Sequence, residues 1–159
     1  IPAQDNSGLV TIVLTDANGD PASSELCTEV YDYIMSPDEP TQRVAPINAY
    51  LSVIAPETIA IGVKATVELT EEATMDAVQE AFIDNMIQYL PEALADGEIK
   101  ITKVAAILSG TAGVNDFEDL QIGIDTECTI TYGTTNIQIE STQLPTISSD
   151  DVTLTEGTV

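Results

Sequence analysis

The sequence contains no histidine, which removes the commonest general base and the commonest metal ligand from its 159 residues. A Ser–His–Asp triad or a Cys–His pair is therefore impossible. Neither GxGxxG nor GxxxxGK[ST] occurs, so the sequence indicates no nucleotide-binding loop. We therefore expect a protein that is not an enzyme and has no cofactor.

Basic residues are scarce, because four of them (Arg43, Lys64, Lys100 and Lys103) stand against 27 acidic residues for a formal net charge of −23. Nucleic-acid binding and attraction to anionic membranes both depend on Lys and Arg, so we expect neither. The acidic excess favours partner surfaces that are neutral or basic. Long hydrophobic runs are also missing, and no stretch approaches the length of a transmembrane helix.

The N-terminal segment IPAQDNSG has no charged leader and no apolar core, so it does not predict a signal peptide. It also lacks an initiator Met, which suggests a fragment of a longer chain.

Only two cysteines are present, Cys27 and Cys128, and they share no CxxC spacing. Buried free thiols in a reducing compartment are the commoner outcome for isolated cysteines, and one long-range disulfide is the alternative. Two distant cysteines without histidine cannot supply the usual four zinc ligands.

One turn offers a weak metal candidate, since Asp16, Asn18 and Asp20 stand at positions 1, 3 and 5 of an EF-hand-like loop. Position 6 is Pro21 where glycine is needed, and position 12 is Cys27 where glutamate is needed. The sequence therefore favours a strand-to-helix turn over a calcium site.

The longest hydrophobic signal is a ribbon from Arg43 to Thr70, which predicts two strands with a corner at Pro56. Apolar residues alternate along each strand, as is typical of strands with one buried face. The buried positions are predicted to be Ile47, Ala49, Leu51 and Val53 in the first strand, and Ile59, Ile61, Val63, Ala65, Val67 and Leu69 in the second.

The ribbon has a predicted helix on each side. The first follows a strand at Leu9–Thr15 and runs from Pro21 to Met35, capped by Asp20 or alternatively by Ser23 or Ser24. The second follows Thr74 and is ended by Pro91 after Leu90, with a turn at Ala93–Gly97. The predicted buried stripes are Leu26, Val30, Tyr33 and Ile34 in the first helix, and Met75, Val78, Phe82, Met86 and Tyr89 in the second.

The remaining chain predicts a short strand from Ile99, a short helix from Thr102 to Leu108 and a strand from Phe117 to Ile124. Short β segments follow, with a hairpin around Tyr132 to Asn136. This order predicts an α+β fold with a βαββαβ-like sheet, or alternatively two small α/β lobes joined near Pro56. The expected organisation is a flexible lead-in at 1–7, an α+β domain at 8–125 that could divide at 56, and a β-rich C-terminal segment at 126–159.

A series of short motifs extends over residues 8 to 155. In the ribbon these are Arg43, Pro46, Ala49, Val53, Ala55 and Pro56, and later Tyr89–Leu90, Gly97, the segment 99–108, Gly113–Val114–Asn115–Asp116, and Asn136–Ile137 through Leu144–Pro145 to Val152. Their order and spacing resemble the C-terminal part of J-like baseplate proteins, which belong to contractile-tailed phages, prophages and related injection particles. Val44–Ala45 is a departure, because in that family the proline more often follows the arginine directly.

The resemblance implies a structural component of a tail baseplate, without catalytic residues, that binds neighbouring baseplate or tail proteins and other copies of itself. It also implies a location in a virion tail or phage-like particle that is assembled in the bacterial cytoplasm. The strong acidity departs in degree from the family and leaves the partners open. The alternative function is an acidic binding or adhesion module, either independent of calcium or dependent on calcium at Asp16, Asn18 and Asp20.

Overall fold

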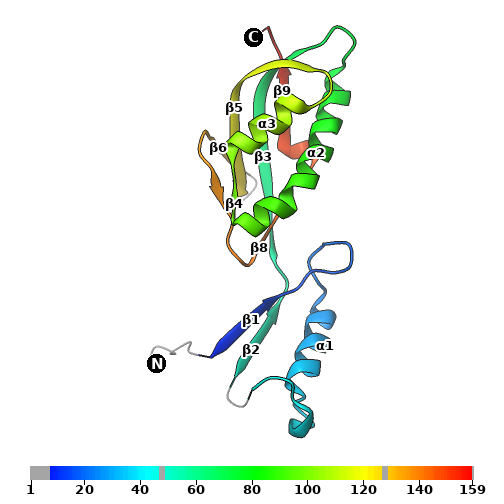
Figure 1. Cartoon of the computed structure of the whole chain (residues 1–159), viewed down its shortest axis with the longest axis vertical. Coiled ribbons are helices and arrows are strands. Elements are labelled where there is room, and N and C mark those ends of the chain that lie inside the picture. Colours follow the sequence, from blue (N-terminus) through cyan, green and yellow to red (C-terminus); the bar gives the residue numbers. More distant parts are fainter. Residues whose placement is uncertain (1–7, 47–48, 127–128, 159) are drawn as a thin grey trace. The chain divides into compact units, whose positions relative to one another are not determined.

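A computed structural model describes residues 8–46, 49–126 and 129–158, and the chain divides into two compact units, 1–57 and 58–159 (Figure 1). The predicted lead-in at 1–7 lies outside the described residues. Helices alternate with strands in mixed sheets, so the predicted α+β class is confirmed. No described helix is long and apolar enough to cross a membrane.

The first unit is a βαβ element. Its parts are β1 (Leu9–Val13), α1 (Ser24–Met35), a short 3-10 turn (Pro40–Gln42) and β2 (Tyr50–Ile54). Strands β1 and β2 pair in parallel, from Leu9 opposite Tyr50 to Val13 opposite Ile54. Parallel neighbours need a crossover connection, and α1 supplies it. Strand β2 pairs with β1 and not with the strand after Pro56, so the ribbon is divided between two sheets, as in the two-lobe alternative.

Helix α1 corrects two predictions. The predicted start at Pro21 is wrong, because Pro21 is still extended and bridges Thr15. The alternative cap is confirmed, since the helix begins after Ser23, whose Oγ accepts the Leu26 N–H at 3.2 Å. Tyr33 was predicted to be buried and is 75% exposed, while Cys27 is the buried residue of the helix. A two-stranded sheet is narrow and covers a narrow stripe of a helix, so Tyr33 lies outside that stripe.

The second unit is a sheet with two helices on one face (Figure 1). Its elements are β3 (Glu57–Leu69), α2 (Met75–Asp96), β4 (Glu98–Ile99), α3 (Ile101–Gly110), β5 (Val114–Thr126), β6 (Thr129–Gly133), β7 (Ile137–Gln138), β8 (Gln143–Thr146), a short 3-10 turn (Ser149–Asp151) and β9 (Val152–Glu156). The strand order is β6-β5-β3-β8, β9 also pairs with β3, and β4 pairs with β7. Strand β3 is antiparallel to β5 and parallel to β9.

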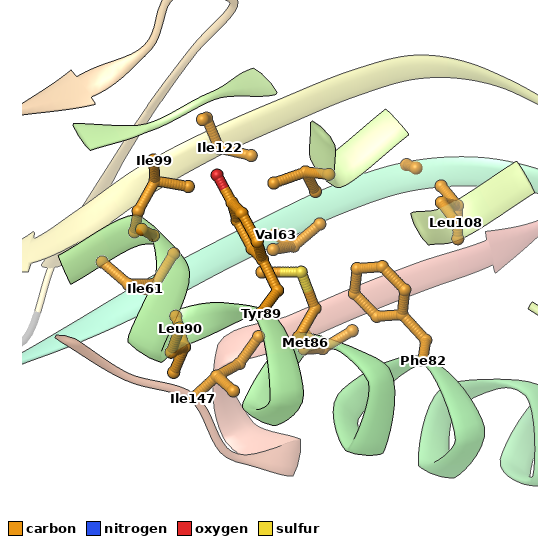
Figure 2. Close-up of a cluster of buried hydrophobic side chains, with 14 of the residues drawn as sticks. Ile61, Val63, Phe82, Met86, Tyr89, Leu90, Ile99, Leu108, Ile122 and Ile147 are labelled. Carbon is orange, nitrogen blue, oxygen red and sulfur yellow. The ribbon is translucent and has the colours of Figure 1, made fainter. Parts of the chain in front are cut away.

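The core of this unit lies between β3 and α2 (Figure 2). The predicted face of β3 is confirmed from Ile59 to Val67, every second residue being buried, and Leu69 is partly buried. The predicted stripe of α2 is confirmed at Val78, Phe82, Met86 and Tyr89, which are buried, and Met75 is partly buried. The alternating pattern of β3 and the helical repeat of α2 therefore identify the two surfaces that pack together.

Two further predictions in this unit are wrong. Helix α2 continues through Pro91 to Asp96 and ends at Gly97, which adopts a left-handed φ of 74°. The turn after Pro91 buries Ala93, and this packing offsets the hydrogen bond that proline cannot donate. The hairpin around Tyr132 to Asn136 is absent from the described strands, because β6 pairs with β5 whereas β7 pairs with β4.

The third helix begins at Ile101 rather than at a Thr102 cap. Its first backbone donors are satisfied from other elements: the Lys100 N–H donates to the Tyr89 hydroxyl at 3.1 Å, and the Ile101 N–H to Asn136 Oδ1 at 3.1 Å. Tertiary partners thus perform the role of the side-chain cap.

Candidate assembly surface

The predicted metal candidates form a turn that is hydrogen-bonded within itself. Asp16 Oδ1 accepts the backbone N–H groups of Asn18 at 2.8 Å and Asp20 at 3.0 Å. This is the pattern of an aspartate-stabilised turn between a strand and a helix. In the ranges that the structure describes, no group of three or more His, Cys, Asp or Glu side chains is arranged to hold a metal ion. Calcium binding at Asp16, Asn18 and Asp20 stays the weaker of the two hypotheses for this turn.

Cys27 is buried on α1 and carries a free thiol. Cys128 lies outside the described residues.

Most of the few basic side chains are engaged within the protein. Lys100 pairs with Asp96 at 2.6 Å, and Lys103 pairs with Glu92 at 3.0 Å. The hydrogen bond from Lys100 lowers the pKa of Asp96 below its ordinary value, and the same bond raises the pKa of Lys100. Arg43 uses its guanidinium to donate to the Ala49 carbonyl at 2.7 Å. The acidic surface is therefore largely uncompensated from within.

The first unit has almost no core. Its buried side chains in the described residues are Ala22, Cys27 and Pro56, and the main hydrophobic cluster begins at Ile59. Among the described residues, five of the seven large hydrophobic side chains that are exposed belong to this unit, namely Leu9, Val10, Tyr33, Val44 and Tyr50. A unit of this size needs a binding partner, a disulfide or a metal ion to be stable. Exposed apolar side chains that lie together mark interaction surfaces.

Three of these residues lie at one end of the two-stranded sheet. Leu9 and Tyr50 are register partners, so their side chains lie on the same face. Val10 follows Leu9 in the strand and points to the opposite face. Leu9 is 46% exposed, Val10 53% and Tyr50 68%, so both faces are open at this end.

Strand β1 also has a free backbone edge. Its pairing with β2 is bounded by the Tyr50 N–H donating to Gly8 O at 3.0 Å and the Leu14 N–H donating to Ile54 O at 2.9 Å. Alternate residues of a strand direct their backbone groups to the same side, so the even-numbered residues of β1 face β2. Leu9, Thr11 and Val13 therefore direct theirs outward, where no described strand pairs with them.

We call this the β1 edge surface: the outward backbone groups of Leu9, Thr11 and Val13 together with the exposed side chains of Leu9, Val10 and Tyr50. Helix α1 packs against β2 and leaves β1 less covered (Figure 1). A groove of about 580 Å³ between α1 and β2 is lined by the apolar groups of Cys27, Tyr31, Val53 and Ile54, among others.

Sequence patterns did not identify this surface. The segment Leu9–Thr15 is predicted as a strand, and an apolar strand is expected to be buried. The signal that could have revealed it is the small number of elements in the first unit: one helix can cover only one face of two strands.

The comparisons with known proteins point to phage-derived particles. No family model matches the chain. In sequence it is 27% identical over 122 residues to the phage-like element PBSX protein XkdT of Bacillus subtilis (strain 168), a match that covers 76% of this chain and 35% of the relative. It is 26% identical over 122 residues to the uncharacterized protein YqbT of the same strain, with the same coverage.

A solved structure shares the fold. The chain matches part of the baseplate of the anti-feeding prophage, determined by cryo-electron microscopy with six-fold symmetry, with a TM-score of 0.50 and 12% identity. The match covers 87% of this chain and 29% of that one. The chain thus spans about a third of the length of the relatives that it matches, and it is similar in sequence to a phage-like element protein and in fold to part of a baseplate protein.

Proposed function

We propose that this chain is part of a structural component of a contractile-tail baseplate, in a phage or a prophage-like particle, and that it acts by subunit assembly rather than catalysis. The similarity to XkdT and the shared fold with the anti-feeding prophage baseplate support a tail or baseplate component. The motif order from Arg43 to Val152 further supports a J-like protein within that group.

The observation that carries the proposal is the first unit, which exposes apolar residues and has almost no core of its own. Such a unit is expected in a protein whose folded surface is completed by neighbours, as in permanent assemblies. Its partners are neighbouring baseplate or tail proteins, with other copies of itself as a further partner. The particle is assembled in the bacterial cytoplasm and takes no nucleic acid or membrane at this segment, as the acidic charge favours.

The test is co-expression of the full-length parent with the products of its neighbouring genes, followed by electron microscopy. We expect baseplates or tail tips that contain the parent, and none when the parent gene is omitted. Omission of a neighbour that encodes no tail protein is the matched control and should leave the particles intact. A parent that stays alone, or particles that form equally well without it, would contradict the proposal.

A further inference from the structure

We propose that the β1 edge surface receives a β-strand from a different protein, one with basic residues flanking an apolar strand, and not from a second copy of this chain. This inference rests on the proposed function and names the chemistry of one partner. Strand addition to an exposed edge is a recurring mode of recognition, in which backbone hydrogen bonds supply affinity and side chains supply specificity.

The first step is that the β1 edge carries none of the usual protection. Edge strands of soluble proteins are commonly blocked by lysine, proline, a bulge or an inward charge. From Gly8 to Thr15 the sequence is GLVTIVLT, without a charge or a proline. Such an edge persists in a functional protein when a partner strand covers it.

The second step is that the free side of the strand is continuous. After β2 ends, the segment at Asp20 to Ala22 takes its place on the same side of the chain, since the Asp16 N–H donates to Asp20 O at 2.7 Å and the Ala22 N–H donates to Leu14 O at 3.1 Å. Both contacts use even-numbered residues. The odd-numbered side is therefore open over the whole of β1 in the described part of the chain.

The third step is charge. Residues 1–57 hold nine acidic residues and one basic residue, for a formal net charge of −8. The one basic residue, Arg43, is directed to the Ala49 carbonyl, and no ion pair forms among the described residues of this unit. A partner with basic residues flanking its apolar strand would be attracted to this surface, because complementary charge steers association and fixes partner choice.

The same charge opposes a second copy. Two copies would bring together two units of formal net charge −8, each within a chain of formal net charge −23. Like charges across an interface are unfavourable and select against the wrong partner. The apolar centre of the β1 edge surface would suit either occupant, so the charge around it decides between them.

Thr11 is the position that tests the proposal, because it is exposed in the middle of β1 and its backbone N–H is on the free side. Thr11→Pro removes that donor without removing a bond to β2. Thr11→Val keeps the donor and is the matched control. Thr11→Lys and Thr11→Glu place opposite charges at the same point of the edge and report the sign of the partner's charge.

The experiment measures association and dissociation of the full-length parent with each purified neighbouring tail protein, and with itself, at about 50 and about 500 mM NaCl. We expect one neighbour whose association slows by about tenfold or more at the higher salt. Thr11→Pro should weaken its binding by about tenfold or more, and Thr11→Val should not. Thr11→Lys should weaken it, while Thr11→Glu should leave it unchanged or tighter. Equal melting temperatures of the Pro and Val variants show that the fold is retained.

Three results would overturn the inference: no neighbour binds, Thr11→Pro has no effect on binding, or Thr11→Lys strengthens binding or self-association. The last would identify an acidic partner or a second copy. If the full-length protein with Thr11→Pro still assembles into particles, the proposal that β1 receives a partner strand fails while the proposed function stands. If the unaltered parent forms no particle, the proposed function itself fails.

Discussion

Gly62 and Gly123 are register partners in β3 and β5, and the side chain of Ile130 from β6 lies close to both. A Cβ on Gly62 would meet Ile130 Cγ2 at 2.6 Å, and a Cβ on Gly123 would meet the Thr131 carbonyl oxygen at 2.4 Å. The first neighbour is a side chain that can shift, whereas the second is backbone. Glycine is therefore required more strictly at 123 than at 62.

Gly123→Ala should lower the free energy of unfolding by about 1–3 kcal/mol, since the new methyl group displaces the β6 backbone. Gly133→Ala in β6 is the control, because a Cβ there meets no atom within 4 Å. It should change stability by less than about 0.5 kcal/mol. Urea unfolding of the two variants measures the difference, and equal stabilities would show that β6 is not held where the structure places it.

Calcium should leave the melting temperature unchanged at millimolar concentration. Asp16 Oδ1 already accepts two backbone N–H groups, and Pro21 and Cys27 stand where a calcium loop requires glycine and glutamate. A calcium titration followed by thermal melting checks this expectation, with magnesium as the control cation. A calcium-specific rise in melting temperature would favour the adhesion-module alternative.

The pair of Asp96 and Lys100 predicts a pH dependence of stability. The pKa of Asp96 in the folded protein is below 3.8, its ordinary value, because Lys100 donates a hydrogen bond to its carboxylate. The pair therefore stabilises the fold above about pH 3.8, and this contribution is lost as the pH falls through the lower folded pKa. Asp96→Asn should be less stable than the unaltered protein at neutral pH, and the two should converge in acid.

Urea unfolding across this range measures that difference. Asp84→Asn on the same helix is the control, because Asp84 has no basic partner in the described residues and its replacement should not produce the same convergence. A stability difference for Asp96→Asn that stays constant into strong acid would contradict the assigned cause.

Among the elements, α2 shows most clearly which residues hold the second unit together. Phe82 is fully buried against the sheet (Figure 2). Ile87 on the same helix is 50% exposed. Phe82→Ala should reduce the free energy of unfolding by about 3–5 kcal/mol through lost burial and a residual cavity. Ile87→Ala should cost less than about 1 kcal/mol. Chemical denaturation of both variants checks the contrast, and a similar loss at the two positions would mean that α2 is rotated from its described orientation.

Elements with one buried and one exposed face were predictable from sequence. Strand β3 alternates over its length because helices cover one face only, and α2 carries a helical stripe for the same reason. The end of α2 was not predictable, because burial of Ala93 after Pro91 depends on a sheet assembled from distant residues. The partners of β6 and β7 were missed because pairing of Ile137 with Ile99 leaves no local signal.

The candidate surface was less predictable than the fold. Leu9, Val10 and Tyr50 have the residue types of a buried strand, and their exposure follows from how few elements surround them. A two-stranded sheet with one helix cannot cover both faces and both edges. The turn at Asp16 was predictable from the sequence, because its hydrogen bonds join residues only a few positions apart.

At the scale of the whole molecule, the two units differ in how they are stabilised. Residues 58–159 hold the hydrophobic cluster, whereas residues 1–57 hold most of the large hydrophobic side chains that are exposed in the described part of the chain. This division suits an assembly protein with one self-sufficient part and one part that is completed by neighbours. Acidic residues are spread over both units, and a high net charge of one sign favours solubility.

The most direct test of the assembly function is amide hydrogen exchange at residues 9–13, compared between the free chain and purified tail particles that contain the parent. The outward N–H groups of Leu9, Thr11 and Val13 should exchange rapidly in the free chain and be protected in the particle. The buried amide of Val63 should be protected in both samples and serves as the reference. Equal, rapid exchange at residues 9–13 in both samples would contradict the account, because the surface assigned to assembly would then be uncovered in the assembled state.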